Sequence, residues 1–341
     1  MKNTRLFLFR DKSNELILFG VGLVSYVVMS FLMPDRFFTI SNAHNMLFQA
    51  AELGILSLAM ALTIIIAGID LSVVSTANLT AIVIILFQRI LPKSWLNIPS
   101  AFFLVIILGF VLGSINGLLV AKVKVSPILA TLGTMTLYSG ISIGITNGAT
   151  IAGIPESMQT IGAGLFLAIP IPLYFFIFCS LIIAWILNRT PFGFKLYLLG
   201  NNPNVTRFSG YNNDRLTIVT YIISGILSAL AGLIFLCRSN SAYADYGKSY
   251  ITLTILIVVL GGVSVTGGRG RIGGIVLALL VMQVFSTGFN MLLLPFGNSN
   301  FFKDFLYGVL LISILMINPV LKNTKIVKKS RKNNKSENVF R

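Results

Sequence analysis

The chain has 341 residues, of which 55% are hydrophobic and only 11% are charged. These proportions exclude a water-soluble domain, because such a domain needs more polar residues to cover its surface. The formal net charge of +16 would suit nucleic-acid binding in a soluble protein, but the basic residues lie in alternate loops between apolar stretches, a distribution typical of membrane topology.

Apolar stretches long enough to cross a bilayer recur from Leu16 to Asn318. The first follows the basic segment 1–15 and lacks a small-residue cleavage site, so we expect an uncleaved span and not a removed signal peptide. The ten predicted spans cover residues 16–33, 46–67, 71–88, 101–121, 127–146, 165–188, 216–237, 251–266, 272–294 and 301–318. We therefore expect an all-α polytopic membrane protein with one transmembrane domain over residues 16–318.

The positions of the basic residues predict the orientation of this domain. An even number of spans puts both termini on one side, and cytoplasmic loops hold the excess of Lys and Arg. With both termini in the cytoplasm, 20 of the 26 basic residues fall on the cytoplasmic side. The tail 319–341 contains eight basic residues and little to bury, so we expect it to be mobile and drawn to anionic lipid headgroups, with no binding of nucleic acid.

The junction between the second and third predicted spans contains an acid, Asp70, between two apolar runs. A carboxylate at the bilayer centre costs about 2.5–3.5 kcal/mol. One interpretation is that Asp70 caps a helix that begins at Leu71. The other is that Asp70, Ser72, Ser75 and Asn78 line a polar pathway or a moving hinge, since carboxyl, hydroxyl and amide groups suit hydroxylated solutes.

Three more polar side chains, Glu52, Asn116 and Gln283, stand alone in apolar surroundings. Hydrogen bonds between helices are the role that the sequence favours for them. Asn116 is also a candidate for the translocation pathway or hinge, together with Asp70, Ser72 and Asn78.

Glycine recurs at every fourth residue in the fourth predicted span and again in and after the fifth. This spacing places the glycines of one helix along a single face, where a neighbouring helix can approach closely. The two series are Gly109, Gly113 and Gly117, and Gly140, Gly144 and Gly148. Helix packing is therefore favoured over a role in lining the pathway.

The longest internal cytoplasmic segment covers residues 189–215. It contains Thr190-Pro191-Phe192-Gly193 and Gly200-Asn201-Asn202-Pro203-Asn204, and a helix is predicted to begin near Asn202 or Pro203. A basic and partly apolar cytoplasmic element suits a docking surface for another subunit. A plain connecting loop is the alternative.

The sequence offers no phosphate-binding loop, metal site or disulfide framework. No G-x-x-x-x-G-K-[ST] is present, and the single Gly-Lys-Ser at Gly247–Ser249 has Ala242 where the first glycine belongs. Cys179 and Cys237 lie in apolar runs without C-x-x-C spacing, and His44 is the only histidine. We therefore expect this chain to hold no cofactor and to be no ATPase itself, so any ATP hydrolysis must come from a partner.

Four ordered motifs carry a resemblance to a known family. They are Gly68-Ile69-Asp70-Leu71-Ser72, Pro127-Ile128-Leu129-Ala130-Thr131-Leu132-Gly133-Thr134-Met135, Val259-Leu260-Gly261-Gly262 with Gly267-Gly268-Arg269-Gly270, and the segment Thr190 to Gly210. Over roughly residues 40–318 the chain resembles the ribose-type permease family of ATP-binding-cassette importers, which includes simple-sugar and autoinducer-2 permeases. Ala67 and Val74 depart from it, because the family usually has glycine there, and they could stiffen that junction.

The resemblance implies a membrane-spanning subunit in the bacterial inner membrane that imports a monosaccharide or a related polar solute. It implies a cytoplasmic ATPase pair, an extracytoplasmic solute-binding protein and a second permease, as a homodimer or a related heterodimer. The segment that resembles the family's ATPase-contacting loop assigns coupling to Pro191, Gly193, Gly200, Asn202, Pro203, Arg207 and Gly210. The permease would alternate access when the ATPases pull on this loop.

Two other function classes stay open from the residues alone. An ion-coupled secondary transporter would use Asp70 or Glu52 as a proton or cation site. An integral-membrane enzyme would concentrate acids, histidines or metal ligands at one membrane face, and this sequence shows no such cluster. Among solutes, a nucleoside or a furanose signalling molecule is the alternative to a monosaccharide.

Overall fold

The computed structural model describes residues 2–91, 95–293 and 305–312, and it is built almost entirely of helices. The helices are α1 (Lys2–Leu32), α2 (Pro34–Phe37), α3 (Ile40–Ile65), α4 (Val73–Ile90), α5 (Asn97–Ala121), α6 (Pro127–Thr146), α7 (Glu156–Ala163), α8 (Ile171–Arg189), α9 (Pro191–Asn201), α10 (Pro203–Phe208), α11 (Asn213–Ser239), α12 (Tyr250–Leu260) and α13 (Ile272–Leu293). Strands β1 (Ile151–Ala152) and β4 (Ser241–Ala242) form one antiparallel pair, and β2 (Leu165–Phe166) and β3 (Ile169–Pro170) form another.

Seven helices in the described part of the chain are long and apolar enough to cross a membrane, namely α3, α4, α5, α6, α8, α11 and α13. Two further predicted spans correspond to shorter apolar helices, Leu18–Leu32 within α1 and Tyr250–Leu260. The span predicted over residues 251–266 is too long, because α12 ends where Gly262 takes a left-handed conformation with φ of 87°. The protein is thus a multi-pass helical membrane protein, and the total of ten spans stays a prediction.

At the two ends of the chain, the structure either differs from the predicted segment boundaries or does not describe the residues concerned. The segment 1–15 does not precede the first helix, because α1 begins at Lys2 and continues to Leu32. Most of the last predicted span, over residues 301–318, and the whole basic tail 319–341 lie outside the described residues.

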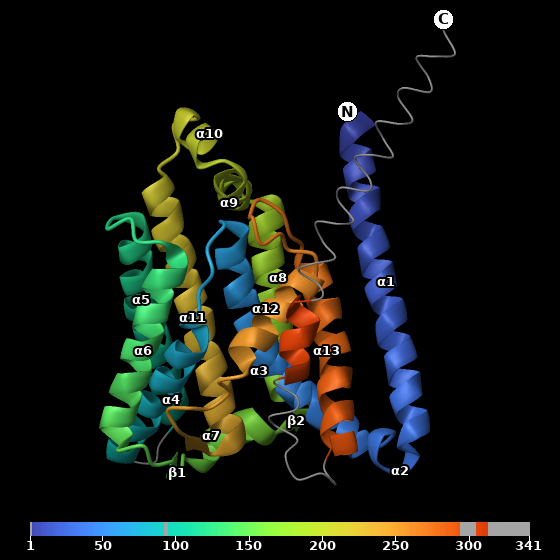
Figure 1. The fold of residues 1–341 in the computed structure, drawn as a ribbon. Coiled ribbons are helices and arrows are strands. Elements are labelled where there is room, and N and C mark those ends of the chain that lie inside the picture. The colour runs from blue at the N-terminus through green and yellow to red at the C-terminus, as the bar shows by residue number, and fades with distance from the viewer. Residues whose placement is uncertain (1, 92–94, 294–304, 313–341) are drawn as a thin grey trace, which may run out of the picture.

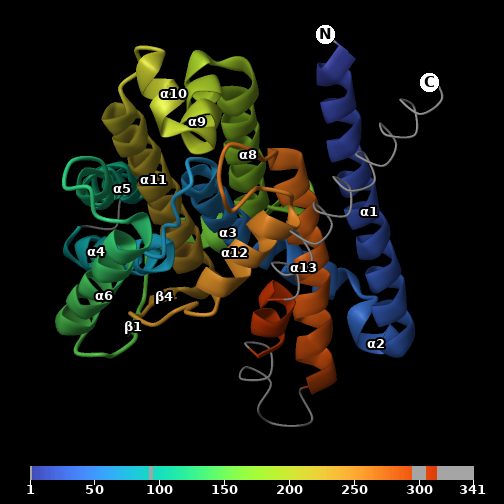
Figure 2. The ribbon, with the colours of Figure 1, turned by 45° about the horizontal axis from the view of Figure 1, so that its top comes forward.

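Helix α3 forms the centre of the bundle. Over the most apolar 18 residues of α3, 89% of the residues are buried, as expected for a helix that is hydrophobic on all sides. Helices α8, α11, α12 and α13 pack around it, and α1 lies at the edge of the bundle against α13 (Figures 1 and 2). Its buried position leaves α3 with very little surface for lipid.

The connections between helices divide between two ends of the bundle. Helices α9 and α10 lie at one end, with the start of α1, while β1, α7, β2 and α2 lie at the other (Figure 1). At the α9–α10 end, Asp214 at the start of α11 pairs with Lys122 at 3.5 Å and Lys124 at 2.6 Å, which follow α5. The loops with the predicted cytoplasmic basic residues therefore gather at the α9–α10 end.

Candidate functional site

The segment 66–72 between α3 and α4 is unwound. Helix α3 ends in a left-handed cap, in which Gly68 N donates to Thr63 O and Ala67 N donates to Ile64 O, both at 2.9 Å. Ala67 has a φ of 62°, a conformation that usually takes glycine. The chain then runs back alongside α3 into the bundle before α4 begins at Val73 (Figure 1). Such non-helical backbone is tolerated at membrane depth only where protein surrounds it.

Asp70 is the centre of the hydrogen bonds that hold this segment. Its side chain is 2% exposed, and its Oδ1 accepts from Ser72 N at 3.0 Å and from Ser72 Oγ at 2.6 Å. Its Oδ2 accepts from Ser224 Oγ of α11 at 3.1 Å. The predicted helix start at Leu71 is wrong, because α4 begins at Val73 with Ser72 as its cap residue. The carboxylate therefore joins the start of α4 to α11.

Asn116 of α5 extends this network to a third helix. Its Nδ2 donates to Ser72 Oγ at 2.7 Å, and its Oδ1 accepts from Thr134 Oγ1 of α6 at 2.6 Å. The interhelical hydrogen bonds expected of Asn116 are thus confirmed. Thr131 of α6 adds contacts with the backbone, since its Oγ1 donates to Ile69 O at 2.9 Å and accepts from Leu71 N at 3.1 Å.

Of the five predicted pathway residues, the structure thus brings Asp70, Ser72 and Asn116 together through side-chain hydrogen bonds, and Ser75 Oγ donates to Ser72 O at 3.0 Å. Their assignment to a translocation pathway or hinge stays a prediction. Sequence reasoning missed Thr131, Thr134 and Ser224 as partners. The first two lie in the quoted motif Pro127 to Met135, which marked the segment without marking the role of its hydroxyl groups.

Asn78 lies apart from this network. Its Nδ2 donates to the carbonyl oxygens of Ala244 and Tyr246, both at 2.9 Å. Those two residues belong to the connection that follows β4, so Asn78 ties α4 to the segment between α11 and α12. Of the polar residues that the sequence grouped around Asp70, Asn78 is thus the one that belongs to another cluster.

Glu52 of α3 is the centre of that second cluster, which also includes Arg238 and Tyr246. The Glu52 carboxylate is 1% exposed and pairs with the Arg238 guanidinium of α11 at 3.1 Å. Tyr246 Oη donates to Glu52 Oε1 at 2.8 Å and accepts from Arg238 at 2.9 Å. The hydrogen bonds between helices expected of Glu52 are therefore confirmed. Because its charge is compensated by arginine, Glu52 is poorly suited to exchange a proton or cation.

A small cavity adjoins this cluster. Glu52, Asn78, Phe235, Tyr246 and Tyr250 are among the residues that line it, and its volume is about 10 Å³. That space is close to the minimum for one water molecule, so it does not admit a sugar in this conformation. Among the described residues, no group of three or more His, Cys, Asp or Glu side chains is arranged to hold a metal ion.

The glycines of α5 lie against α11. A β-carbon at Gly109, Gly113 or Gly117 would meet backbone atoms of Ile226, of Tyr221 and Ile222, or of Ile218, respectively. From the α11 side, a β-carbon at Gly225 would meet backbone atoms of both Gly109 and Gly113. Ordinary side chains on this face would force the two helices apart.

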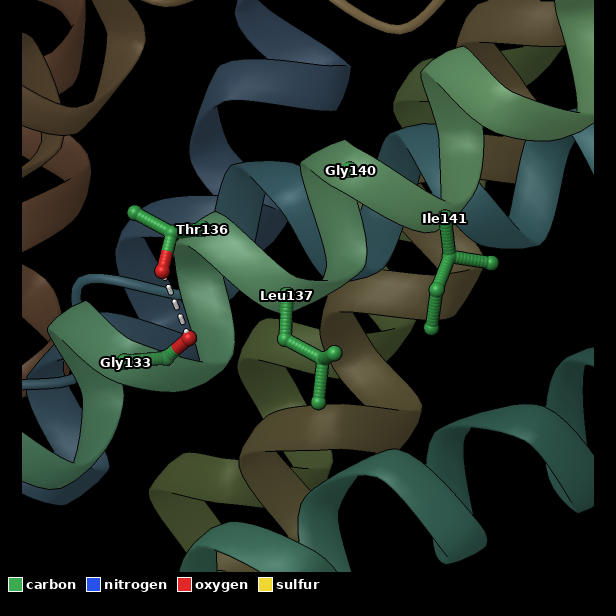
Figure 3. A pocket seen from close by; sticks show the side chains of 5 residues that line it. All are labelled: Gly133, Thr136, Leu137, Gly140 and Ile141. Carbon is green, nitrogen blue, oxygen red and sulfur yellow. Dashed lines mark hydrogen bonds between the residues drawn. The ribbon is translucent and has the colours of Figure 1, made fainter.

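The glycines of the second predicted series have no such neighbour. A β-carbon at Gly140, Gly144 or Gly148 would meet no described atom within 4 Å. Among the described residues, no helix approaches these glycines, so the close packing expected there stays a prediction. Instead, Gly140 contributes to an open hollow of about 530 Å³ with Gly133, Thr136, Leu137 and Ile141, all on α6 (Figure 3).

The segment 189–215 is ordered as two short helices with local caps. Thr190 Oγ1 accepts from Gly193 N at 3.3 Å, and Pro191 occupies the first turn of α9. Asn202 Oδ1 accepts from Asn204 N at 3.0 Å, and Pro203 opens α10. The helix start predicted near Asn202 and Pro203 is confirmed.

The tip of this segment is apolar and exposed. Phe208 at the end of α10 is 91% exposed, and Phe194 and Val205 are exposed as well. Arg207, also in α10, is exposed, and Gly210 follows with a φ of 81° that lets the chain turn towards α11. A compact apolar tip with basic residues suits protein contact better than a plain connecting loop.

Comparisons with known proteins cover most of the transmembrane domain. Residues 42–315 match the family described as the permease component of the branched-chain amino acid transport system. The chain is 37% identical to the ribose import permease protein RbsC of Haemophilus influenzae over 79% of this chain and 83% of that protein. It is 36% identical to RbsC of Bacillus subtilis, over 87% of this chain and 90% of the relative.

The chain belongs to the ribose-type permease family of ATP-binding-cassette importers. The permease is also 33% identical to the autoinducer 2 import system permease protein LsrD of Salmonella typhi, over 77% of this chain and 79% of that protein. No solved structure matches it. Membership of this family confirms the predicted resemblance. It makes the permease a transport subunit of an ATP-driven system, and this function is favoured over an ion-coupled transporter and over a membrane enzyme.

Replacing Asn116 by leucine tests whether the Asp70 network stabilises the permease. Asn116→Leu removes the hydrogen bonds to Ser72 and Thr134 with little change in volume, so we expect the free energy of unfolding to fall by about 1–3 kcal/mol. The measurement is thermal unfolding in detergent. Ser114→Ala in the same helix is the matched control, because Ser114 Oγ has no hydrogen-bond partner. An equal loss in both variants would contradict the prediction.

Proposed function

We propose that this permease translocates a monosaccharide across the bacterial inner membrane, with energy from a separate ATPase subunit that holds ATP and Mg. The relatives named as ribose import permeases support the solute class. Those named as autoinducer 2 permeases support the second candidate, a furanose-like signalling molecule, and a nucleoside is a third solute to be tested. In this proposal the permease chain itself holds no cofactor.

The observation that carries the proposal is the exposed tip formed by α9 and α10, which we define as the docking tip (Pro191–Phe208). It combines local caps, which fix its shape, with the exposed aromatic side chains of Phe194 and Phe208. Large exposed aromatic side chains supply much of the binding energy of protein interfaces. We propose that the docking tip binds the ATPase subunit and therefore lies on the cytoplasmic side of the membrane. Both termini of the permease would lie on the same side.

The opposite end of the bundle then faces the extracytoplasmic solute-binding protein. It consists of α2, α7 and the β1–β4 and β2–β3 pairs (Figure 1).

We also propose that two permeases pair, either as identical chains or with a related second permease. The open hollow on α6 supports such pairing, because small residues let helices of two subunits approach closely (Figure 3).

The first test is affinity purification of the tagged permease from its native membrane in mild detergent, with mass spectrometry of the proteins that co-purify. An ATPase with a Walker motif and a second permease copy are the expected partners. The binding protein of the same system is then screened for ribose, other pentoses and hexoses, autoinducer 2 and nucleosides. Repeated recovery without any ATPase would overturn the proposal.

A charge reversal at the docking tip tests its assignment to the ATPase. Arg207 is exposed on α10, so Arg207→Glu is expected to leave membrane insertion unchanged. We expect the affinity for the ATPase to fall about tenfold, which corresponds to about 1.4 kcal/mol. Binding of purified ATPase to permease in nanodiscs measures this change. Arg36→Glu, exposed in α2 at the opposite end, is the control, and equal effects of the two variants would contradict the assignment.

A further inference from the structure

Three segments that are far apart in the sequence meet at the base of the docking tip. The Ile65 carbonyl at the end of α3 accepts a hydrogen bond from Gly268 N, in the turn before α13, at 2.8 Å. Gly200, near the end of α9, lies directly against the same carbonyl group. A β-carbon at Gly200 would overlap the Ile65 oxygen and stand 2.6 Å from Gly268 N. Helix α9 therefore touches the end of α3 through backbone atoms.

The turn before α13 closes this contact from the other side. Gly267 and Gly268 have φ values of 78° and 70°, which ordinary side chains rarely adopt. A β-carbon at Gly267 would stand 2.7 Å from Gly200 O and 2.8 Å from Ala67 N. We name this set of residues the glycine junction; its members are Ile65, Ala67, Gly200, Gly267 and Gly268.

A side-chain hydrogen bond fixes α9 to the same turn. Tyr197 Oη donates to Gly270 O at 2.9 Å, beside the glycine junction. Burial raises the pKa of Tyr197 to about 12, although the charge of Arg271 lowers it. The phenol is thus protonated at neutral pH and keeps this hydrogen bond.

The glycine junction leads directly into the unwound segment 66–72. Ala67 belongs to the junction, and Asp70 follows it in the same segment. Beyond Ala67, the segment is bonded to α6 through Thr131, to α11 through Ser224 and to α5 through Asn116. One end of the segment is therefore held by the base of the docking tip, and the other by three helices of the bundle.

We propose that the glycine junction transmits movement of α9 into the segment 66–72, and through Asp70 to α5, α6 and α11. The inference rests on the proposed function, because it takes the ATPase to bind the docking tip. Flexible side chains between α9 and α3 would absorb a displacement by changing rotamer. Backbone atoms in van der Waals contact cannot do so, and packed elements shift between discrete arrangements. Gly200 is thus a positioning residue for transport.

The test compares Gly200→Ala and Tyr197→Phe with wild type in liposomes that contain the permease, its ATPase and its binding protein. The quantity measured is solute transported per ATP hydrolysed. For Gly200→Ala we expect this ratio to fall about tenfold, within the roughly 5- to 150-fold range of coupling between sites. Tyr197→Phe should lower it about threefold, because it removes one hydrogen bond and no packing. Gly20→Ala in α1 is the control, since no described atom lies within 4 Å of its new methyl group.

The outcomes separate the inference from the proposed function. An unchanged ratio in both variants overturns the inference, and so does an equal loss of ATPase activity and transport, which a structural role alone would produce. If Gly200→Ala does not fold, the ratio measured for Tyr197→Phe decides. Failure of the wild-type permease to bind any ATPase overturns the proposed function instead.

Discussion

Arg238→Met is expected to lower the free energy of unfolding by about 3–5 kcal/mol, because it leaves the buried carboxylate of Glu52 without its ion pair. Tyr246 still donates one hydrogen bond to Glu52, and one neutral hydroxyl does not replace a bidentate guanidinium. Thermal unfolding of the purified permease in detergent measures the loss. The yield of monodisperse protein should fall with it.

The double variant Glu52→Gln with Arg238→Met is the matched control. Glutamine keeps an acceptor for Tyr246 and removes the charge that the single variant strands in the core. Buried ion pairs replaced as a pair are often neutral for stability, so the double variant should recover most of the loss. If the double variant is as unstable as Arg238→Met alone, the effect comes from lost packing and the explanation by charge is wrong.

Gly113→Leu is expected to cost about 3 kcal/mol, because a side chain at this position overlaps the backbone of α11 at Tyr221 and Ile222. The contact is between two helix backbones, so rotamer changes cannot relieve it. The loss is measured as the change in free energy of unfolding in detergent.

Gly20→Leu provides the comparison for Gly113→Leu. Gly20 is an exposed glycine of α1 with no described atom within 4 Å of an added β-carbon. Leucine also favours helix over glycine, so this variant should be neutral or more stable. Similar losses at Gly20 and Gly113 would show that the permease rejects any large residue in place of glycine, whatever its neighbours.

The sequence predicted the helical membrane fold and most of the spans, because lipid imposes apolar runs of a fixed length. It also placed the start of α10 correctly, since the Asn202 and Pro203 pair has a strong local preference for that position. It overestimated the span over residues 251–266. Hydropathy alone did not show that Gly262 turns the chain out of the helix.

The candidate site was accessible to sequence reasoning only in part. Asp70 and Asn116 stood out because polar groups are costly in apolar runs. Their partners Thr134 and Ser224 did not, because hydroxyl groups are common in membrane helices and bond readily to their own backbone. Asn78 was grouped with Asp70 through nearness in sequence, yet α4 carries it to the connection between α11 and α12. Three-dimensional arrangement, and not residue type, separates these clusters.

The central position of α3 has a consequence for the order of assembly in the cell. Glu52 precedes Arg238 by 186 residues, so α3 is synthesised long before its ion-pair partner exists. At a synthesis rate of about 5–20 residues per second, that interval lasts roughly 10–40 s. Until Arg238 is made, α3 has neither its ion-pair partner nor the later helices α12 and α13, which pack against it. We therefore expect the translocation machinery to shelter α3 until α11, α12 and α13 have been synthesised and can pack around it.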